Sequence, residues 1–390
     1  MRSAQRRAVN QLTGIVAPGD TIAAVVSFGH RILRIEKRRR PNGNYDRVLP
    51  GFIDLQVNGS RGIDVMSATA NDLLELSHCL AHEGTTGWLP TVITSPLDRI
   101  ERIDAVIADA IAAQAEMERA ARRGSNTQIG ATILGMHLEG PFISPVRRGA
   151  HPPLNLLPRG DALERVLRLK SLKLITLAPE LDGALDAIRL LAARGVAVSI
   201  GHTDATCDQA MAGVEAGARM FTHVFNAMPP LHHRAPGAVG AALSRSAAMA
   251  AVIPDGVHLH PSITDLVFRA RGPEGMILTT DRVALAGADN REVSLFGNAT
   301  NGARVKDGAA RLPNGTLAGS IITMHDGVRM MFELGHLTEL QIQRVSSANP
   351  AAVLGLKNRG AIKPAARADL ILLDRELNLK AVFVGGRELD

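Results

Sequence analysis

The sequence predicts an α/β protein built on a parallel (β/α)8 TIM-like barrel, with a small β-sandwich domain formed by both termini. Between about residues 50 and 355, short apolar and β-branched segments alternate with segments of helical periodicity. Strands that alternate with helices over this length favour a closed parallel barrel over an open sheet. In addition, several of the expected strands end on a metal-capable or acidic side chain, and catalytic groups of such barrels lie at the carboxyl ends of the strands.

The expected barrel elements follow in chain order. The clearest helix begins at Ser95-Pro96, a good N-cap followed by proline at the first helical position, and continues to Gly124. Further helices are expected at Asn71–Glu83, Asp182–Ala193 and Asp204–Ala216. The expected barrel strands are Phe52–Val57, Trp88–Thr94, Thr132–Leu138, Leu172–Leu177, Val196–Ile200, Arg219–His223, Ala250–Ile253 and Met276–Thr280.

The two ends of the chain carry a different pattern. Strand-like runs occur at Thr21–Ser27 and Arg31–Ile35 near one end, and at Asp369–Leu373 and Lys380–Val384 near the other. Neither end could bury a core alone, so we expect them to combine. The expected domains are residues 1–49 and 359–390, which together make the small β domain, and residues 50–358, which make the catalytic barrel.

Composition excludes several classes of protein. Apolar residues make up 46% of the 390 residues, but no apolar run approaches the roughly 18 residues of a membrane helix. The net charge of +6 is modest and aromatic residues are only 3%, so neither a nucleic-acid partner nor a membrane partner is expected. The basic start lacks the apolar core of a secretory signal, and two cysteines suit a reducing compartment, so we expect the cytoplasm.

Three strand ends carry the chemistry that the sequence makes most visible. Glu139, His202 and His223 each follow an apolar or β-branched run and precede a turn. Taken singly, each is as well explained as a helix cap, an ion pair or a core histidine. Taken together, a carboxylate and two imidazoles at one face of a barrel make a plausible divalent-metal site with room for water.

The chain also resembles a known family, colinearly from about Pro50 to the C-terminus. It is similar to the N-acetylglucosamine-6-phosphate deacetylases of the amidohydrolase superfamily. The motifs that carry the resemblance are His137-Leu138-Glu139-Gly140-Pro141-Phe142, Gly149-Ala150-His151, Gly201-His202-Thr203, Thr222-His223 with Asn226-Ala227-Met228-Pro229, Asp255-Gly256-Val257-His258, Thr280-Asp281, Leu317-Ala318-Gly319-Ser320 and Asn349-Pro350-Ala351.

The resemblance implies a set of roles. Glu139, His202 and His223 would hold one divalent ion per chain, zinc or another first-row ion. Asp281 would take a proton from water and return it to the leaving amine, and His151 would support the substrate carbonyl as a catalytic and substrate-binding group. The remaining substrate-binding residues would be Asn226, Ala227, His258 and Arg234. Arg234 would bind the phosphate across a dimer interface, so the expected partners are a phosphorylated amino sugar and a second copy of this chain.

Two departures from common patterns stand out. Arg282 follows the expected base, where relatives usually have a small residue, and this puts the local loop in question. The first strand carries Gln56 and Asn58 where many amidohydrolases have His-x-His. Amides are poor ligands for such metals, so we interpret both as supporting or structural residues and expect a single ion.

Other substrates and other classes of protein are the alternatives to this function. The same chemistry on N-acetylgalactosamine 6-phosphate or another N-acyl substrate stays open, because the motifs do not choose the sugar epimer. A non-catalytic scaffold would have lost ligands or base, and all are present. A cyclic-amide hydrolase or deaminase would usually keep the His-x-His that is missing here.

Overall fold

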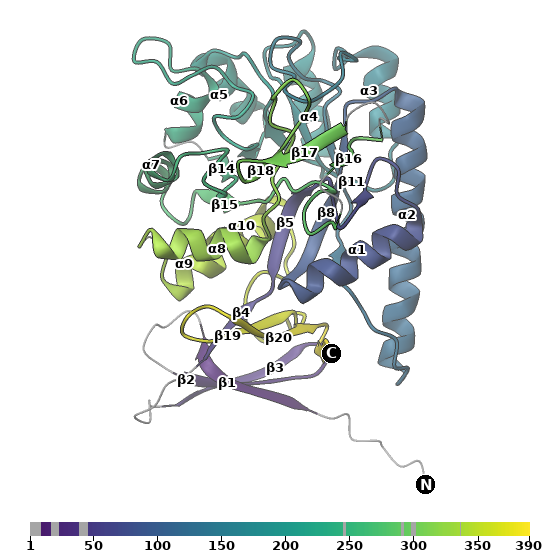
Figure 1. Cartoon of the computed structure of the whole chain (residues 1–390), viewed down its shortest axis with the longest axis vertical. Coiled ribbons are helices and arrows are strands. Elements are labelled where there is room, and N and C mark those ends of the chain that lie inside the picture. The colour runs from purple at the N-terminus through teal and green to yellow at the C-terminus, as the bar shows by residue number, and fades with distance from the viewer. Residues whose placement is uncertain are drawn as a thin grey trace.

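A computed structural model describes residues 9–16, 23–38, 46–244, 247–289, 292–297, 302–335 and 337–390. Within these residues, parallel strands pair in the order β5, β8, β10, β11, β12, β13, β14 and β15, and β9 (Thr132–Ile133) pairs with β8. Their bounds are Phe52–Val57, Thr85–Ile93, Met136–Glu139, Leu172–Leu177, Ala197–Ile200, Met220–Phe221, Met249–Val252 and Met276–Leu278. The predicted (β/α)8 barrel is confirmed (Figure 1).

The barrel closes between the first and last of these strands. The backbone N–H of Asp281 donates to the carbonyl oxygen of Gln56 at 3.0 Å. Below it, the hydroxyls of Thr279 and Thr280 donate to the buried carboxylate of Asp54 at 2.8 and 2.6 Å. The polar residues that follow β15 therefore join β5 through side-chain as well as backbone hydrogen bonds.

Helices cover the outside of the barrel. Three begin later than the sequence predicts, and one of them is α4 (Ala184–Ala193), which begins two residues after Asp182. In α2 (Leu97–Arg122), Pro96 takes the N-cap position and no side chain caps the helix. In α5 (Cys207–Ala216), Thr206 and Gln209 form a capping box that sets the start three residues after Asp204. The other helices are α1 (Ala70–His82), α3 (Gly160–Leu167), α6 (Gly237–Leu243), α7 (Pro261–Arg271), α8 (Met324–Glu333), α9 (Glu339–Gln343) and α10 (Asn349–Val353), with a π-helical turn η1 at Arg344–Ala348.

Both termini contribute to one further sheet, below the barrel in Figure 1. Its described strands pair in the order β21, β20, β19, β4, β1, β2 and β3. The sheet folds over itself, since the rings of Phe28 and Phe383 meet with their centroids 5.3 Å apart. The predicted sandwich is thus one folded sheet. Its strands are β1 (Asn10–Val16), β2 (Ala23–Phe28), β3 (Ile32–Arg38), β4 (Arg47–Pro50), β19 (Leu370–Leu373), β20 (Leu379–Val384) and β21 (Arg387–Glu388).

Some features were not predicted, and some predictions lie outside the described residues. A three-stranded antiparallel sheet, β16 (Glu292–Ser294), β17 (Gly302–Lys306) and β18 (Ala309–Arg311), is inserted after β15, and a two-stranded ribbon, β6 (Gly59–Ser60) and β7 (Ile63–Asp64), follows β5. The basic start of the chain and the first two residues of the predicted strand Thr21–Ser27 lie outside the residues that the structure describes. No described helix is both long enough and apolar enough to span a membrane.

Candidate active site

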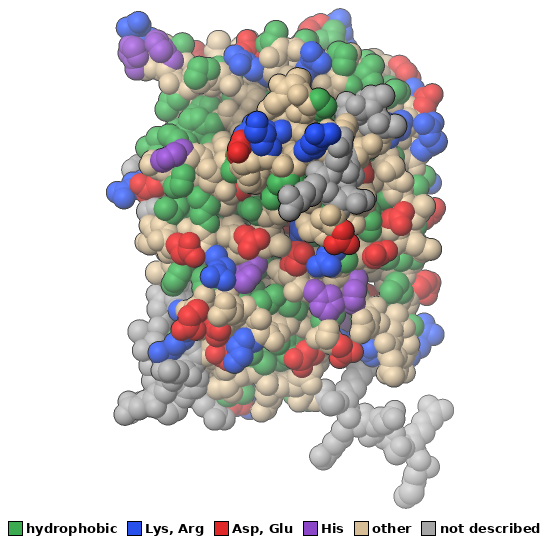
Figure 2. Space-filling model, viewed as in Figure 1, with side chains coloured by type: hydrophobic (Ala, Val, Ile, Leu, Met, Phe, Trp, Pro, Cys, Tyr) green, Lys and Arg blue, Asp and Glu red, His purple; other side chains and the backbone are tan. Residues whose placement is uncertain are grey.

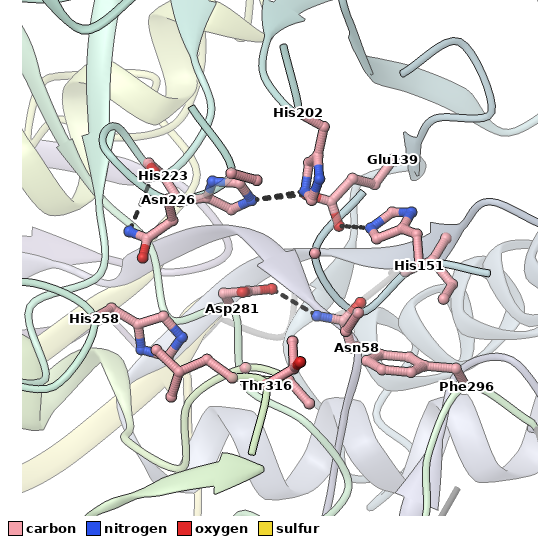
Figure 3. A pocket seen from close by; sticks show the side chains of 17 residues that line it. Asn58, Glu139, His151, His202, His223, Asn226, His258, Asp281, Phe296 and Thr316 are labelled. Carbon is pink, nitrogen blue, oxygen red and sulfur yellow. Dashed lines mark hydrogen bonds and ion pairs between the residues drawn. The ribbon is translucent and has the colours of Figure 1, made fainter. Parts of the chain in front are cut away.

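Three strand ends bring Glu139, His202 and His223 together at the mouth of the barrel (Figure 3). Glu139 is the last residue of β10, and each histidine follows its strand, β12 or β13, by two residues. All three side chains are buried. The Nε2 atoms of His202 and His223 lie 3.1 and 3.0 Å from Glu139 Oε1, and 3.1 Å from each other.

This donor set fits a divalent first-row ion. Two imidazole nitrogens and one carboxylate oxygen are the ligands of catalytic zinc sites, which keep a further position for water or substrate. Tetrahedral bonds of the usual length would place ligand atoms about 3.3 Å apart, close to the separations in this cluster. Nδ1 of His202 lies 3.0 Å from the carbonyl oxygen of Arg147, which turns Nε2 toward the cluster. Among the described residues, these three are the metal-capable side chains whose ligand atoms lie close enough together, within 4.8 Å of one another, to hold one ion.

The charge states of Glu139 and His202 suit metal binding, whereas for His223 burial, which lowers the pKa, is outweighed by the hydrogen bond and the charge of Glu139, which raise it. Burial by itself raises the pKa of Glu139, but His202, His151 and His223 outweigh it and hold that pKa well below its usual range. Burial, followed by the charge of His151, lowers the pKa of His202 to about 4. A deprotonated carboxylate and a neutral imidazole are the forms that bind metals.

Two further side chains hold Glu139 in place. The side-chain amide of Gln56, in the barrel interior, donates a hydrogen bond of 2.8 Å to Glu139 Oε1. Nε2 of His151 lies 3.4 Å from Oε2, and its Nδ1 lies 3.0 Å from the hydroxyl of Thr94. The structure therefore places Gln56 as a donor to the cluster and His151 at its edge.

Asp281 lies across the pocket from this cluster (Figure 3). The amide of Asn58 donates to Asp281 Oδ1 at 2.7 Å. Burial, with the negative charge of Glu139 added, raises the pKa of Asp281 to about 7. That value is suited to a group that both accepts and releases a proton near neutral pH.

The backbone at the site is held in an uncommon conformation. Asp281, His202 and His223 have φ values of 50°, 48° and 24°, in the left-handed region that residues other than glycine seldom occupy. Each follows a buried strand, so the turn directs the side chain into the barrel mouth. Such conformations persist where the surrounding structure holds them, and they cluster at functional sites.

The pocket between these groups has a volume of about 270 Å³. Asn226, Ala227 and His258 line the pocket, and Asp255 contacts Nδ1 of His258 at 2.6 Å. The segment that follows β18 also lines the pocket. The remaining lining residues are Asn58, Ile93, Glu139, Gly149, Ala150, His151, His202, His223, Asp281, Phe296, Thr316, Leu317, Ala318 and Gly319.

Two arginines that the sequence singled out lie outside the pocket. Arg234 is exposed on the loop before α6 and does not line the pocket of its own chain. Arg282 is buried, and its guanidinium pairs with Glu83 at the C-terminal end of α1. The unusual residue after Asp281 therefore turns away from the site.

Sequence reasoning missed four contributors to the site. Phe296 and Thr316 line the pocket, Thr94 contacts His151, and Asp255 orients His258. Asp255 has a sequence signal, because Asp-Gly three residues before a histidine favours a tight turn that returns the carboxylate to the ring. Phe296 and Thr316 have none, since they reach the pocket only because the inserted sheet lies beside the barrel mouth.

Comparison with known proteins places this chain in a family. A model of the amidohydrolase family matches residues 47–389. The chain is 35% identical over 345 residues to the N-acetylglucosamine-6-phosphate deacetylase of Lysinibacillus sphaericus, covering 87% of this chain and 84% of that relative. It is also 35% identical over 342 residues to the N-acetylgalactosamine-6-phosphate deacetylase of Escherichia coli O157:H7, covering 87% and 86%.

Solved structures agree with the sequence relatives. N-acetylglucosamine-6-phosphate deacetylase from Thermotoga maritima superposes with a TM-score of 0.85 at 30% identity, over 98% of this chain and 99% of that one. A mutant of the Mycobacterium smegmatis enzyme, in complex with N-acetyl-D-glucosamine-6-phosphate, gives a TM-score of 0.83 at 30% identity, again over 98% and 99%. The chain belongs to the amidohydrolase family and, within it, to the N-acetylglucosamine-6-phosphate deacetylases.

Proposed function

We propose that this protein hydrolyses the acetamide of N-acetyl-D-glucosamine 6-phosphate to D-glucosamine 6-phosphate and acetate. One observation carries the proposal. The buried carboxylate of Asp281 lies in one pocket with the buried Glu139–His202–His223 cluster. That arrangement suits metal-assisted hydrolysis of an amide, and relatives at 35% identity are deacetylases of this substrate.

In the proposed reaction, Glu139, His202 and His223 hold one divalent ion, with zinc as the first choice for two nitrogens and one oxygen. A bound ion would supply Lewis acidity toward the acetamide carbonyl and the attacking water. Asp281 accepts the proton of that water on Oδ2, because Oδ1 already accepts the Asn58 amide. The same carboxyl then donates the proton to the leaving amine.

His151 and His258 position the substrate on either side of the reacting bond. His151 is anchored through Nδ1 at Thr94, so its Nε2 faces the cluster, where it can donate to the oxygen of the acetyl group. His258 is anchored through Nδ1 at Asp255, which leaves Nε2 for a sugar hydroxyl. Both assignments follow the direction in which the anchored ring points.

Phosphate recognition is assigned to Asn226, the backbone of Ala227, and Arg234 of a second copy of the chain. Asn226 and Ala227 line the pocket, whereas Arg234 is exposed and outside it. An arginine suits phosphate because its charge is permanent and its geometry is bidentate. The working assembly is therefore proposed to be a homodimer. We propose the cytoplasm as its compartment, since Cys79 and Cys207 are both free thiols.

The test is acetate release from a panel of substrates, with metal content measured on the same preparation. The panel holds the 6-phosphates of N-acetylglucosamine and N-acetylgalactosamine, and both unphosphorylated sugars. We expect turnover of a 6-phosphate and little turnover without phosphate. The galactosamine substrate is included because one relative at 35% identity is named for it. Absence of acetate release from N-acetylglucosamine 6-phosphate by a fully metal-loaded protein would overturn the proposal, and release from the galactosamine phosphate alone would reassign the sugar.

A further inference from the structure

A second group of imidazoles lies on α1, away from the pocket. His78 and His82 are four residues apart on this helix, so they lie on the same side of it, one turn apart. Their Nε2 atoms are 3.1 Å from each other and their rings meet edge to face, with centroids 4.5 Å apart. Figure 2 shows histidine side chains gathered at the surface in the region of α1.

The spacing of the two nitrogens matches that of two ligands on one ion. With Zn–N bonds of about 2.0–2.1 Å, two imidazoles are about 2.9 Å apart at a right angle and about 3.3 Å apart at a tetrahedral angle. The observed 3.1 Å falls between these values. The separation of the two nitrogens therefore already suits two ligands of one ion.

The surroundings favour an incoming cation. Burial, with the charge of His82 added, lowers the pKa of His78, so its imidazole is neutral at physiological pH and can act as a ligand. His82 lies in the last turn of α1, where the helix dipole contributes partial negative charge. Neutral imidazoles prefer Zn²⁺, Ni²⁺ and Cu²⁺ to Mg²⁺ or Ca²⁺.

We propose that His78 and His82 form a second binding site for a first-row divalent transition metal, in which the protein supplies two ligands and water completes the coordination. The site is distinct from the Glu139–His202–His223 cluster and does not depend on the proposed deacetylation. It also has a consequence for metal analysis. A content of two ions per chain would be expected at high metal concentration without a binuclear active centre.

The experiment starts from tag-free protein loaded with one equivalent of zinc, to which Zn²⁺ is added in competition with a chromophoric chelator. We expect one further equivalent in the unmodified chain. His82→Ala and His78→Ala should each weaken the affinity for this second ion. Loss of a residue that only supports a metal ligand costs roughly 10- to 100-fold in affinity, and loss of a ligand itself should cost more. Acetate release at one equivalent of zinc should be unchanged in His82→Ala, since His82 is exposed and the residues that line the pocket do not include any of α1.

The matched control is His233→Ala. His232 and His233 are also adjacent imidazoles, with ring centroids 4.3 Å apart, but Nδ1 of His232 already accepts the backbone N–H of Arg234. This variant should keep the second equivalent. Persistence of that equivalent in His82→Ala, its loss in His233→Ala, or no second binding in the unmodified chain at millimolar zinc would each overturn the proposal. In the last case, the contact between His78 and His82 is an N–H···N hydrogen bond and nothing more.

Discussion

Arg282 and Glu83 form a buried ion pair beside the point where the barrel closes. The Arg282 side chain is 2% exposed and that of Glu83 is 17% exposed. The carbonyl oxygen of Arg282 accepts the N–H groups of Asn58 and Gly59 at 2.8 and 3.2 Å. The ion pair therefore stabilises the junction of two segments, one that carries Asp281 and one that carries Asn58, whose amide donates to Asp281.

Loss of one partner of this pair should be costly. Glu83→Gln leaves the Arg282 charge buried without a countercharge, which typically destabilises a protein by about 3–5 kcal/mol. Arg61, at 3.7 Å from Glu83, is a cation like Arg282 and therefore cannot replace the lost countercharge. Urea unfolding of the metal-loaded protein measures the effect. The double variant Glu83→Gln/Arg282→Met should recover much of the loss, and a double variant no more stable than the single one would contradict this account.

Asp281→Asn should fold and retain one metal ion but lose most of its turnover. The amide still accepts the Asn58 hydrogen bond through Oδ1, but it cannot take a proton from water. Removal of a general base typically costs about 10²- to 10⁴-fold. The measurement is kcat for acetate release with metal content determined in parallel. Turnover near that of the unmodified protein in a fully metal-loaded variant would show that Asp281 is not the base.

The same substitution should change how the metal-free protein responds to pH. The pKa of Asp281 in the folded chain is raised to about 7, mainly by burial and by Glu139. A raised pKa means that its contribution to stability is present at low pH and is lost as pH rises through about 7. Metal-free Asp281→Asn should therefore gain in stability over the unmodified protein between pH 5 and pH 8, as measured by urea midpoints. Parallel curves for the two proteins across that range would contradict the assignment.

Arg234→Ala should raise KM for the 6-phosphate substrate and leave the unphosphorylated analogue nearly unaffected. A charge-assisted, bidentate contact is worth about 2–3 kcal/mol, so the expected rise is roughly 30- to 150-fold. Because Arg234 lies outside the pocket of its own chain, the effect should depend on dimerisation. Sedimentation and mixed-dimer complementation with Asp281→Asn test this dependence. An equal loss for both substrates would refute the phosphate role.

Metal content should be one tightly held ion per chain in the active site. Gln56 donates to Glu139 and Asn58 donates to Asp281, so both amides are engaged by side chains of the site. Replacing both with histidine should create affinity for a second active-site ion without raising turnover. The His82→Ala background removes the proposed site on α1 from the count. The His82→Ala variant with Gln56 and Asn58 unchanged should bind one ion. If it bound two, and acetate release rose as the second bound, the active site would not be mononuclear.

Local patterns predicted most of the barrel because its strands are buried and short. Phe52–Val57 and Leu172–Leu177 were predicted at their observed bounds, since continuous apolar and β-branched runs leave little choice of structure. Helix starts were predicted less accurately. Ser95 has a good capping side chain, yet Pro96 is the N-cap, and Thr206 with Gln209 sets the start of α5. Caps depend on a few hydrogen bonds that several neighbouring residues could make.

The sequence by itself determined the kinds of group available, which include a carboxylate and two imidazoles at strand ends and an Asp after the last strand. It also determined that these ends meet, because parallel strands with helical connections place their carboxyl ends on one face. Only the tertiary structure decided that Arg282 pairs with Glu83, 199 residues away, and that Phe296 and Thr316 reach the pocket. Such contacts join segments whose separation in sequence carries no signal, so packing of the whole chain is needed to form them.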